Sequence, residues 1–286
     1  MQMGKEPEIF CPTSIDEAIH FLPGFSKIQV VDFERIDFSQ YDLFIALDSS
    51  TLDYATGLKD LPEVAIINID HHKTNDEYGN INLVDRNLVS VAEMIYLLFE
   101  DWEVKIDTPV ATNLLAGIIG DSGVFRFPGT SGRTLEIAGK LMKIGADKDK
   151  IIFHQCFSYG IEYFKFWAEA FSRMQIDEEG KFAWIAIPND IFRKHGGRRD
   201  FKETTATLFL QSVGGTDFGL IMVEVEKGKL GMSLRSREGV DVSAMALEFG
   251  GGGHRYAAGA TVKNLPFEEA VEKVLAVCRR YAKKTS

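Results

Sequence analysis

The chain carries at residues 66–75 the stretch that decides its fold, Ile66-Ile67-Asn68-Ile69-Asp70-His71-His72-Lys73-Thr74-Asn75. Residues 64–69 are almost all apolar, and an acid and two imidazoles follow them directly. An apolar run of this length between polar turn residues is typical of a buried strand in a parallel sheet. Ligands of open α/β sheets bind at the carboxyl ends of the strands, so chemistry is expected at Asp70, His71 and His72. An acid and two surface histidines in a turn would leave the same pattern.

Acids also follow two other predicted elements. Residues 43–47 form a second apolar run that ends at Asp48, and a predicted helix at residues 109–119 leads into Gly120-Asp121-Ser122-Gly123. Carboxylates and neutral imidazoles suit manganese and related divalent ions, and a carboxylate that bridges two ions serves phosphoryl transfer. Singly, Asp48 would fit as a helix cap and Asp121 as a turn residue. The coincidence of both acids with His71 at one edge of one sheet predicts a metal site.

The two histidines are expected to play different parts. Because neighbouring residues of a strand point to opposite faces, one of them would hold a metal while the other faces a substrate.

Residues 1–150 alternate strands and helices, which predicts a doubly wound α/β domain with a parallel sheet. Its predicted strands and helices are residues 43–47, 64–69, 81–84, 90–102, 109–119 and 133–144. The helix at 90–102 is expected to begin with a capping box, in which Ser90 and Glu93 bond each other's backbone amides. Residues 151–174 show a helical and aromatic pattern, which we interpret as the connection to a second domain.

Residues 175–286 predict a smaller α/β domain with a mixed sheet. Strands are expected at 181–187, 220–226 and 229–235, and Lys227-Gly228 indicates a hairpin turn between the last two. Helices are expected at 204–213, 241–249 and 266–283.

A glycine run at residues 250–253 precedes His254 in this second domain. Successive glycines let backbone N–H groups point at one anion, His254 adds a donor, and the guanidinium of Arg235 is a fitting partner for a phosphate. A glycine cap followed by a flexible loop is the alternative.

The composition of the chain argues against some classes of binding partner. The 42 acids outnumber the 32 bases, which argues against indiscriminate binding to nucleic acids or membranes. The cysteines, Cys11, Cys156 and Cys278, are scattered without C-x-x-C spacing, which indicates reduced thiols and a cytoplasmic protein. No apolar run has membrane-spanning length, and we expect no membrane partner.

The order of motifs resembles one family. Asp70-His71-His72 at a strand end, Asp48 upstream, Gly120-Asp121-Ser122-Gly123 downstream and Gly251-Gly252-Gly253-His254-x-x-Ala-Ala-Gly near the C-terminus are similar to the DHH phosphoesterases that carry the DHH-associated C-terminal (DHHA1) domain. The layout looks most like the oligoribonuclease and 3′,5′-bisphosphoadenosine phosphatase branch. The resemblance implies a manganese-dependent hydrolase, with Mg²⁺ or Co²⁺ as substitutes, that acts on short RNA or DNA oligonucleotides, linear dinucleotides or small nucleotides. The resemblance is compatible with a homodimer.

The resemblance also implies roles by position. Asp48 would bridge two metals, and His71 and Asp121 would ligate them. His72 would face the scissile phosphate. Asp70 would orient a histidine without binding the metal itself. The residues implied in substrate binding are Ser122, Arg235, Gly251, Gly252, Gly253 and His254.

One departure from the family pattern affects the metal site. The family's first strand ends in His-x-x-Pro-Asp-x-Asp, which supplies a histidine and two aspartates, and the chain contains no such segment. We therefore expect the first domain to be incomplete at its N-terminus. A catalytically impaired nucleotide-binding protein is the alternative from another class, and a pyrophosphatase, an exopolyphosphatase-like enzyme or a cyclic-dinucleotide phosphodiesterase are the alternatives among enzymes.

Overall fold

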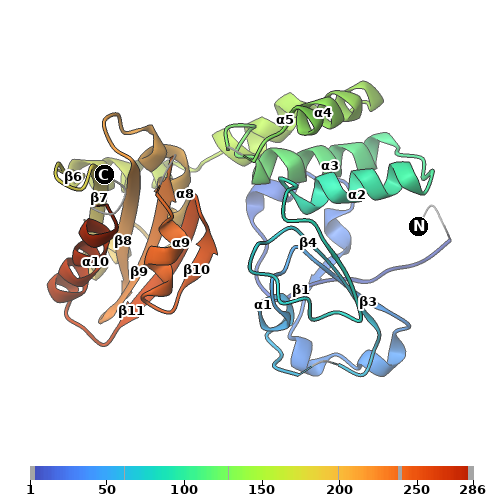
Figure 1. Cartoon of the computed structure of the whole chain (residues 1–286), viewed down its shortest axis with the longest axis horizontal. Coiled ribbons are helices and arrows are strands. Elements are labelled where there is room, and N and C mark those ends of the chain that lie inside the picture. The colour runs from blue at the N-terminus through green and yellow to red at the C-terminus, as the bar shows by residue number, and fades with distance from the viewer. Residues whose placement is uncertain (1–3, 61, 128, 199, 238–239, 283–286) are drawn as a thin grey trace. The chain divides into compact units, whose positions relative to one another are not determined.

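A computed structural model describes residues 4–60, 62–127, 129–198, 200–237 and 240–282. The chain divides into two compact units, Met1–Ser158 and Tyr159–Ser286 (Figure 1), each described by itself below. The predicted α/β class is confirmed, with small parallel sheets in the first unit and a six-stranded mixed sheet in the second. Across the described ranges, no helix combines the length and the apolar character that crossing a membrane requires.

The described residues of the first unit form two small parallel sheets. β1 (Ile9–Cys11) pairs with β2 (Ile28–Val30), and a separate sheet has the order β3-β4-β5. The strands of that sheet are β3 (Phe44–Leu47), β4 (Ile66–Asp70) and β5 (Ile81–Val84). Leu47 lies opposite Ile69, so β3 and β4 end side by side. Polar residues that follow these two strands therefore emerge next to each other.

One face of the three-stranded sheet is aliphatic and open to solvent. Ile45, Ile67 and Ile81 lie opposite one another across the three strands, and Leu47 and Ile69 follow on the same face. Ile45, Leu47 and Ile81 are 49%, 49% and 54% exposed. Parallel sheets are usually covered on both faces, so this surface is unusual.

Helices supply the main core of the first unit. The longer ones are α2 (Val91–Asp101), α3 (Thr108–Asp121), α4 (Gly132–Ile144) and α5 (Lys148–Ile152). The shorter ones are α1 (Leu52–Thr56), four 3₁₀ turns (Glu17–Ile19, Phe25–Lys27, Phe33–Arg35 and Phe38–Gln40) and a π-helical turn (Phe153–Phe157). Leu115, Ile118, Leu141 and Ile151 are fully buried in the cluster between the longer helices. Polar caps define where these helices begin, as at Ser90 before α2.

The second unit is built around a sheet of order β10-β11-β9-β8-β7-β6. Its strands are β6 (Gln175–Asp177), β7 (Phe182–Ile187), β8 (Phe218–Glu226), β9 (Lys229–Ser236), β10 (Gly252–His254) and β11 (Ala257–Lys263). β7 and β8 are parallel, and the other neighbouring strands are antiparallel. Sequence patterns predict β7, β8 and β9 but not β6, β10 or β11.

Helices cover both faces of this sheet. They are α6 (Ile161–Ser172), α7 (Asn189–Lys194), α8 (Phe201–Phe209) with a 3₁₀ turn (Leu210–Ser212), α9 (Val242–Leu247) and α10 (Phe267–Ala282). Alternate residues of β8 serve the two faces, because successive side chains of a strand point to opposite sides. Leu220 and Met222 pack with α9 and α10, whereas Ile221 and Val223 pack with α6, α7 and α8. The segment interpreted as a connection, 151–174, spans the end of α5, the π-helical turn and α6, and the two units divide after Ser158.

Candidate active site

The predicted metal site lies at the carboxyl ends of β3 and β4. Asp48 follows the last residue of β3, and its amide donates a 3.0 Å hydrogen bond to the carbonyl oxygen of Ile69. The backbone φ of Asp48 is 57°, in the left-handed region that aspartate tolerates better than most residues. This turn ends the strand and leaves the Asp48 carboxylate beside the residues that follow β4.

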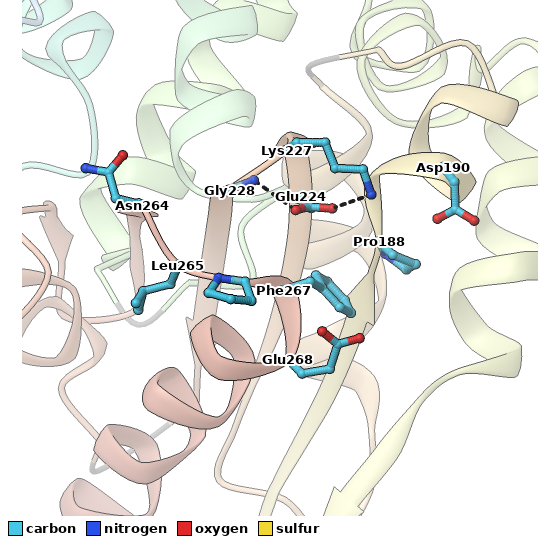
Figure 2. A pocket seen from close by; sticks show the side chains of 10 residues that line it. Pro188, Asp190, Glu224, Lys227, Gly228, Asn264, Leu265, Phe267 and Glu268 are labelled. Atoms are coloured by element: carbon cyan, nitrogen blue, oxygen red, sulfur yellow. Dashed lines mark hydrogen bonds and ion pairs between the residues drawn. The ribbon is translucent and has the colours of Figure 1, made fainter.

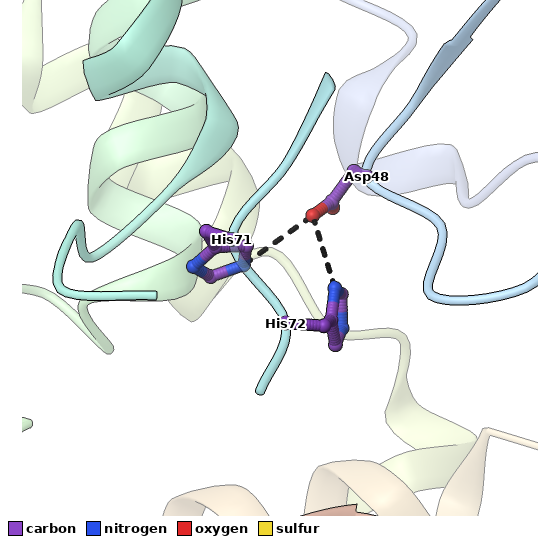
Figure 3. Close-up of side chains that lie close together, drawn as sticks. All are labelled: Asp48, His71 and His72. Carbon is purple, nitrogen blue, oxygen red and sulfur yellow. Dashed lines mark ion pairs between the residues drawn. The ribbon is translucent and has the colours of Figure 1, made fainter. Parts of the chain in front are cut away.

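Both histidines approach Asp48 (Figure 3). Asp48 Oδ1 lies 3.3 Å from His71 Nε2 and 3.8 Å from His72 Nδ1. Within the part of the chain that the structure describes, these three residues form the group whose ligand atoms all lie within 4.8 Å of one another. The expected opposite orientation of the two histidines is not seen, because β4 ends at Asp70 and strand alternation does not continue into His71 and His72.

Asp70 lies fully buried behind the two histidines. Its Oδ1 is 2.7 Å from both the amide of His71 and Nδ1 of His72, and its Oδ2 accepts a 2.5 Å hydrogen bond from Asn75. Burial alone would raise the pKa of Asp70, but the bonds from His72, Asn75 and His71 lower it to about 2. The side chain is therefore an ionised carboxylate that fixes the orientation of the His72 ring.

His71 is held through its other ring nitrogen. Nδ1 lies 3.1 Å from the carbonyl oxygen of Leu88, which turns Nε2 toward Asp48. Burial would lower the pKa of His71, but the hydrogen bonds with Asp48 and Leu88 and the charges of Asp48 and Asp121 raise it to about 9. A metal ion at this position would thus displace a proton from Nε2.

Asp121 is the last residue of α3. Part of its surface is exposed, yet burial of its carboxyl group, followed by the charge of Asp48, raises its pKa to about 7, against the opposing effect of the two histidines. Asp121 lies outside the 4.8 Å group but close enough for its charge to act on His71. Ser122 is fully buried, and its hydroxyl serves the turn after α3, where it accepts a 2.9 Å hydrogen bond from the Phe125 amide.

In the second unit, Arg235 is fixed before any ligand binds. Nη2 and Nε donate to the Thr207 hydroxyl at 2.9 and 3.3 Å, and Nη1 donates to the Leu234 carbonyl at 2.9 Å. Burial lowers the pKa of Arg235. Arg235 pairs with Ala257, which pairs with His254, so the three residues form one row across β9, β11 and β10. Directly paired residues share a face, so this row places Arg235 and His254 on the same side of the sheet.

The glycine run has a packing role at two of its positions. A Cβ on Gly251 would collide with the carbonyl oxygen of Gly259 and with Ala260, and one on Gly253 would lie 2.5 Å from the Ala257 carbonyl oxygen. A Cβ on Gly252 would meet nothing within 4 Å. Gly252 and Gly253 belong to β10, so the alternative of a flexible loop does not hold for these two residues, which lie in a strand paired with β11.

An open hollow of about 650 Å³ lies elsewhere in the second unit, beside the β8–β9 turn (Figure 2). Glu224, one of its lining residues, accepts 3.0 Å hydrogen bonds from the Gly228 and Asn189 amides and lies 3.7 Å from Lys227 Nζ. These contacts hold the hairpin, and none of the predicted site residues lines the hollow.

The side-chain pattern does not single out two groups that hold the site. Asn75 closes the quoted stretch, where it reads as an ordinary turn residue, but it is buried against Asp70. The Leu88 carbonyl that binds His71 is a backbone group, for which a sequence carries no signal.

Known proteins are similar to this chain in sequence and in fold. A family model for the DHHA1 domain matches residues 204–284. The bifunctional oligoribonuclease and PAP phosphatase NrnA of Thermus thermophilus is 32% identical over 235 residues, which cover 82% of this chain and 69% of the relative. The NrnA of Bacillus subtilis is 28% identical over 266 residues, which cover 90% of this chain and 80% of the relative.

A solved structure has the same fold over nearly the whole chain. An exopolyphosphatase-related protein from Bacteroides fragilis superposes with a TM-score of 0.90 at 21% identity, covering 99% of this chain and 86% of the other. The sequence identity to the Thermus protein and the matched DHHA1 domain together assign the chain to a family. The chain belongs to the DHH phosphoesterase family, in which it is related to the NrnA proteins and carries a DHHA1 domain.

Proposed function

We propose that this chain is a metal-dependent phosphoesterase that hydrolyses short oligonucleotides, linear dinucleotides or 3′,5′-bisphosphoadenosine (PAP). The observation that carries the proposal is the convergence of Asp48, His71 and His72, with the buried carboxylate of Asp70 behind them. The names of the NrnA relatives, oligoribonuclease and PAP phosphatase, support short oligonucleotides and PAP as substrates.

The donor set fits a divalent ion such as Mn²⁺. It offers a carboxylate oxygen and imidazole nitrogens within 4.8 Å of one another, the ligand types that such ions accept. Asp48 and His71 would hold the ion, and Asp121 would add a second carboxylate. When bound, the ion would polarise the phosphoryl group and lower the pKa of a bound water.

The chain's own residues would orient the substrate. Asp70 holds Nδ1 of His72, so Nε2 on the opposite side of the ring would meet the scissile phosphate. The guanidinium of Arg235, held by Thr207, would bind a terminal phosphate, and His254 from the same row would add a second contact.

Hydrolysis of a labelled dinucleotide and of PAP in Mn²⁺ tests the proposal. We expect His72→Ala to lower turnover by about 10²–10⁴-fold, the range typical of a positioned acid or base. Arg235→Ala should raise KM more than it lowers kcat, because it removes binding to a remote phosphate. Lys227→Ala, in the hollow of Figure 2, is the control and should keep wild-type rates.

The outcomes separate the alternatives. A protein that binds PAP but hydrolyses neither nucleotide in Mn²⁺, Mg²⁺ or Co²⁺ would be a nucleotide-binding protein instead. Faster hydrolysis of pyrophosphate, polyphosphate or a cyclic dinucleotide than of PAP would move the chain to another phosphoesterase class.

A further inference from the structure

Glu93 is a buried acid outside the cluster described above. Its side chain is 1% exposed. Oε2 accepts hydrogen bonds from the Val89 amide at 3.3 Å and from the Thr134 hydroxyl at 3.1 Å, and Oε1 lies 3.5 Å from Arg133 Nε. Burying a carboxyl group costs free energy unless the group is well paired, so the buried position of Glu93 requires a physical explanation.

The neighbouring helix cap does not depend on Glu93. At the start of α4, Ser131 Oγ accepts the Thr134 amide at 3.1 Å, and Thr134 Oγ1 accepts the Ser131 amide at 3.2 Å. These two residues therefore satisfy each other's backbone groups. The contact between Thr134 and Glu93 is additional to the cap and does not explain why an acid is buried here.

The contact with Val89 leads instead to His71. The amide of Val89 and the carbonyl of Leu88 belong to one planar peptide group. That carbonyl oxygen lies 3.1 Å from His71 Nδ1. Leu88 and Val89 are both buried, with exposed fractions of 6% and 7%. One rigid peptide unit thus joins the Glu93 carboxyl group to the imidazole whose Nε2 faces Asp48.

We propose that Glu93 is a positioning residue that acts on His71 through the Leu88–Val89 peptide group. Hydrogen bonds in a chain polarise one another, so an anionic acceptor on the Val89 amide strengthens the Leu88 carbonyl as an acceptor for Nδ1–H of His71. A proton held on Nδ1 keeps Nε2 as the metal-binding nitrogen and increases its basicity. This inference rests on the proposed function, in which His71 is a metal ligand.

Glu93→Gln tests the proposal, because it keeps the size of the side chain and an acceptor oxygen but removes the charge. In the metal-free protein, we expect the Nδ1–H proton resonance of His71, assigned by its loss in His71→Gln, to move upfield. Mn²⁺ affinity, measured by equilibrium dialysis, should fall about tenfold, as is typical when the outer partner of a metal-binding histidine is lost.

Thr134→Val is the matched control. It removes the other hydrogen bond to the same Glu93 oxygen and weakens the α4 cap, so it should lower the thermal midpoint while leaving the His71 resonance and Mn²⁺ affinity unchanged. Should Glu93→Gln fail to fold, Glu93→Asp replaces it. The shorter acid is withdrawn from the Val89 amide, and the same upfield shift is expected.

An unchanged His71 resonance in the Glu93 variant would overturn the proposal, and so would an equal change in Thr134→Val. Because the spectra need neither metal nor substrate, they remain decisive if the chain proves unable to hydrolyse nucleotides. That result would refute the proposed function alone.

Discussion

At the scale of single residues, the site depends on the groups that hold Asp70 in the interior. Asn75 donates to Asp70 Oδ2 at 2.5 Å and to the Ser49 carbonyl at 3.2 Å. Asn75→Ala would leave a buried carboxylate short of one donor. We expect a loss of about 1.5–3 kcal/mol in the free energy of unfolding, the usual effect for a hydrogen bond to a charged group.

Urea unfolding at pH 7, monitored by far-ultraviolet circular dichroism, measures this loss. Asn87→Ala is the control, because Asn87 is exposed and its side chain bonds to Asp85, two residues away; it should stay within about 0.5 kcal/mol of wild type. Equal stability of the two variants would show that Asn75 does not support Asp70.

Residue types explain why part of the site is predictable. Asp48, His71 and His72 come at or just after the ends of apolar runs, and polar residues at strand ends are visible in a sequence. Glu93 fits a capping box, and half of it forms, since Ser90 Oγ accepts the Glu93 amide at 3.0 Å. The carboxyl group, however, binds the amide of Val89 rather than that of Ser90, because it also faces residues of α4 that are distant in sequence.

At the scale of elements, β10 and β11 form a pair that the sequence pattern conceals. Both strands are rich in glycine and alanine, residues with little strand preference, so neither shows an alternation of large apolar side chains. Their pairing follows from close backbone approach, which a linear pattern does not record. The strands β3, β4 and β5 are predictable because large apolar residues, mostly aliphatic, predominate in their short sequences.

Gly251→Ala and Gly252→Ala separate packing from binding in this pair. The new methyl at Gly251 would collide with the neighbouring strand, whereas the one at Gly252 would enter open space. We expect Gly251→Ala to lose about 1–3 kcal/mol of stability, as overpacked sites do, and Gly252→Ala to fold normally. If Gly252→Ala nevertheless raises KM for PAP, the run also contacts substrate; an unchanged KM would restrict the glycines to packing.

At the scale of the whole molecule, the number of metal ligands limits the number of ions. A two-metal site holds its ions about 3.5–4 Å apart and needs enough acidic and imidazole ligands to offset their repulsion. The compact group here has three members, with Asp121 near it. We therefore expect at most one Mn²⁺ per chain after dialysis, measured by elemental analysis against protein concentration. Two retained ions per chain would show that further residues complete the site.

Sulfate-rich solutions would act on the open aliphatic face of β3, β4 and β5. Sulfate and phosphate are excluded from protein surfaces and thereby strengthen the association of apolar groups. Ile45, Leu47 and Ile81, each about half exposed, would then favour contact between copies of the chain. In crystals grown from ammonium sulfate, we accordingly expect lattice contacts that cover this face. Stock solutions should aggregate less in dilute chloride than in sulfate.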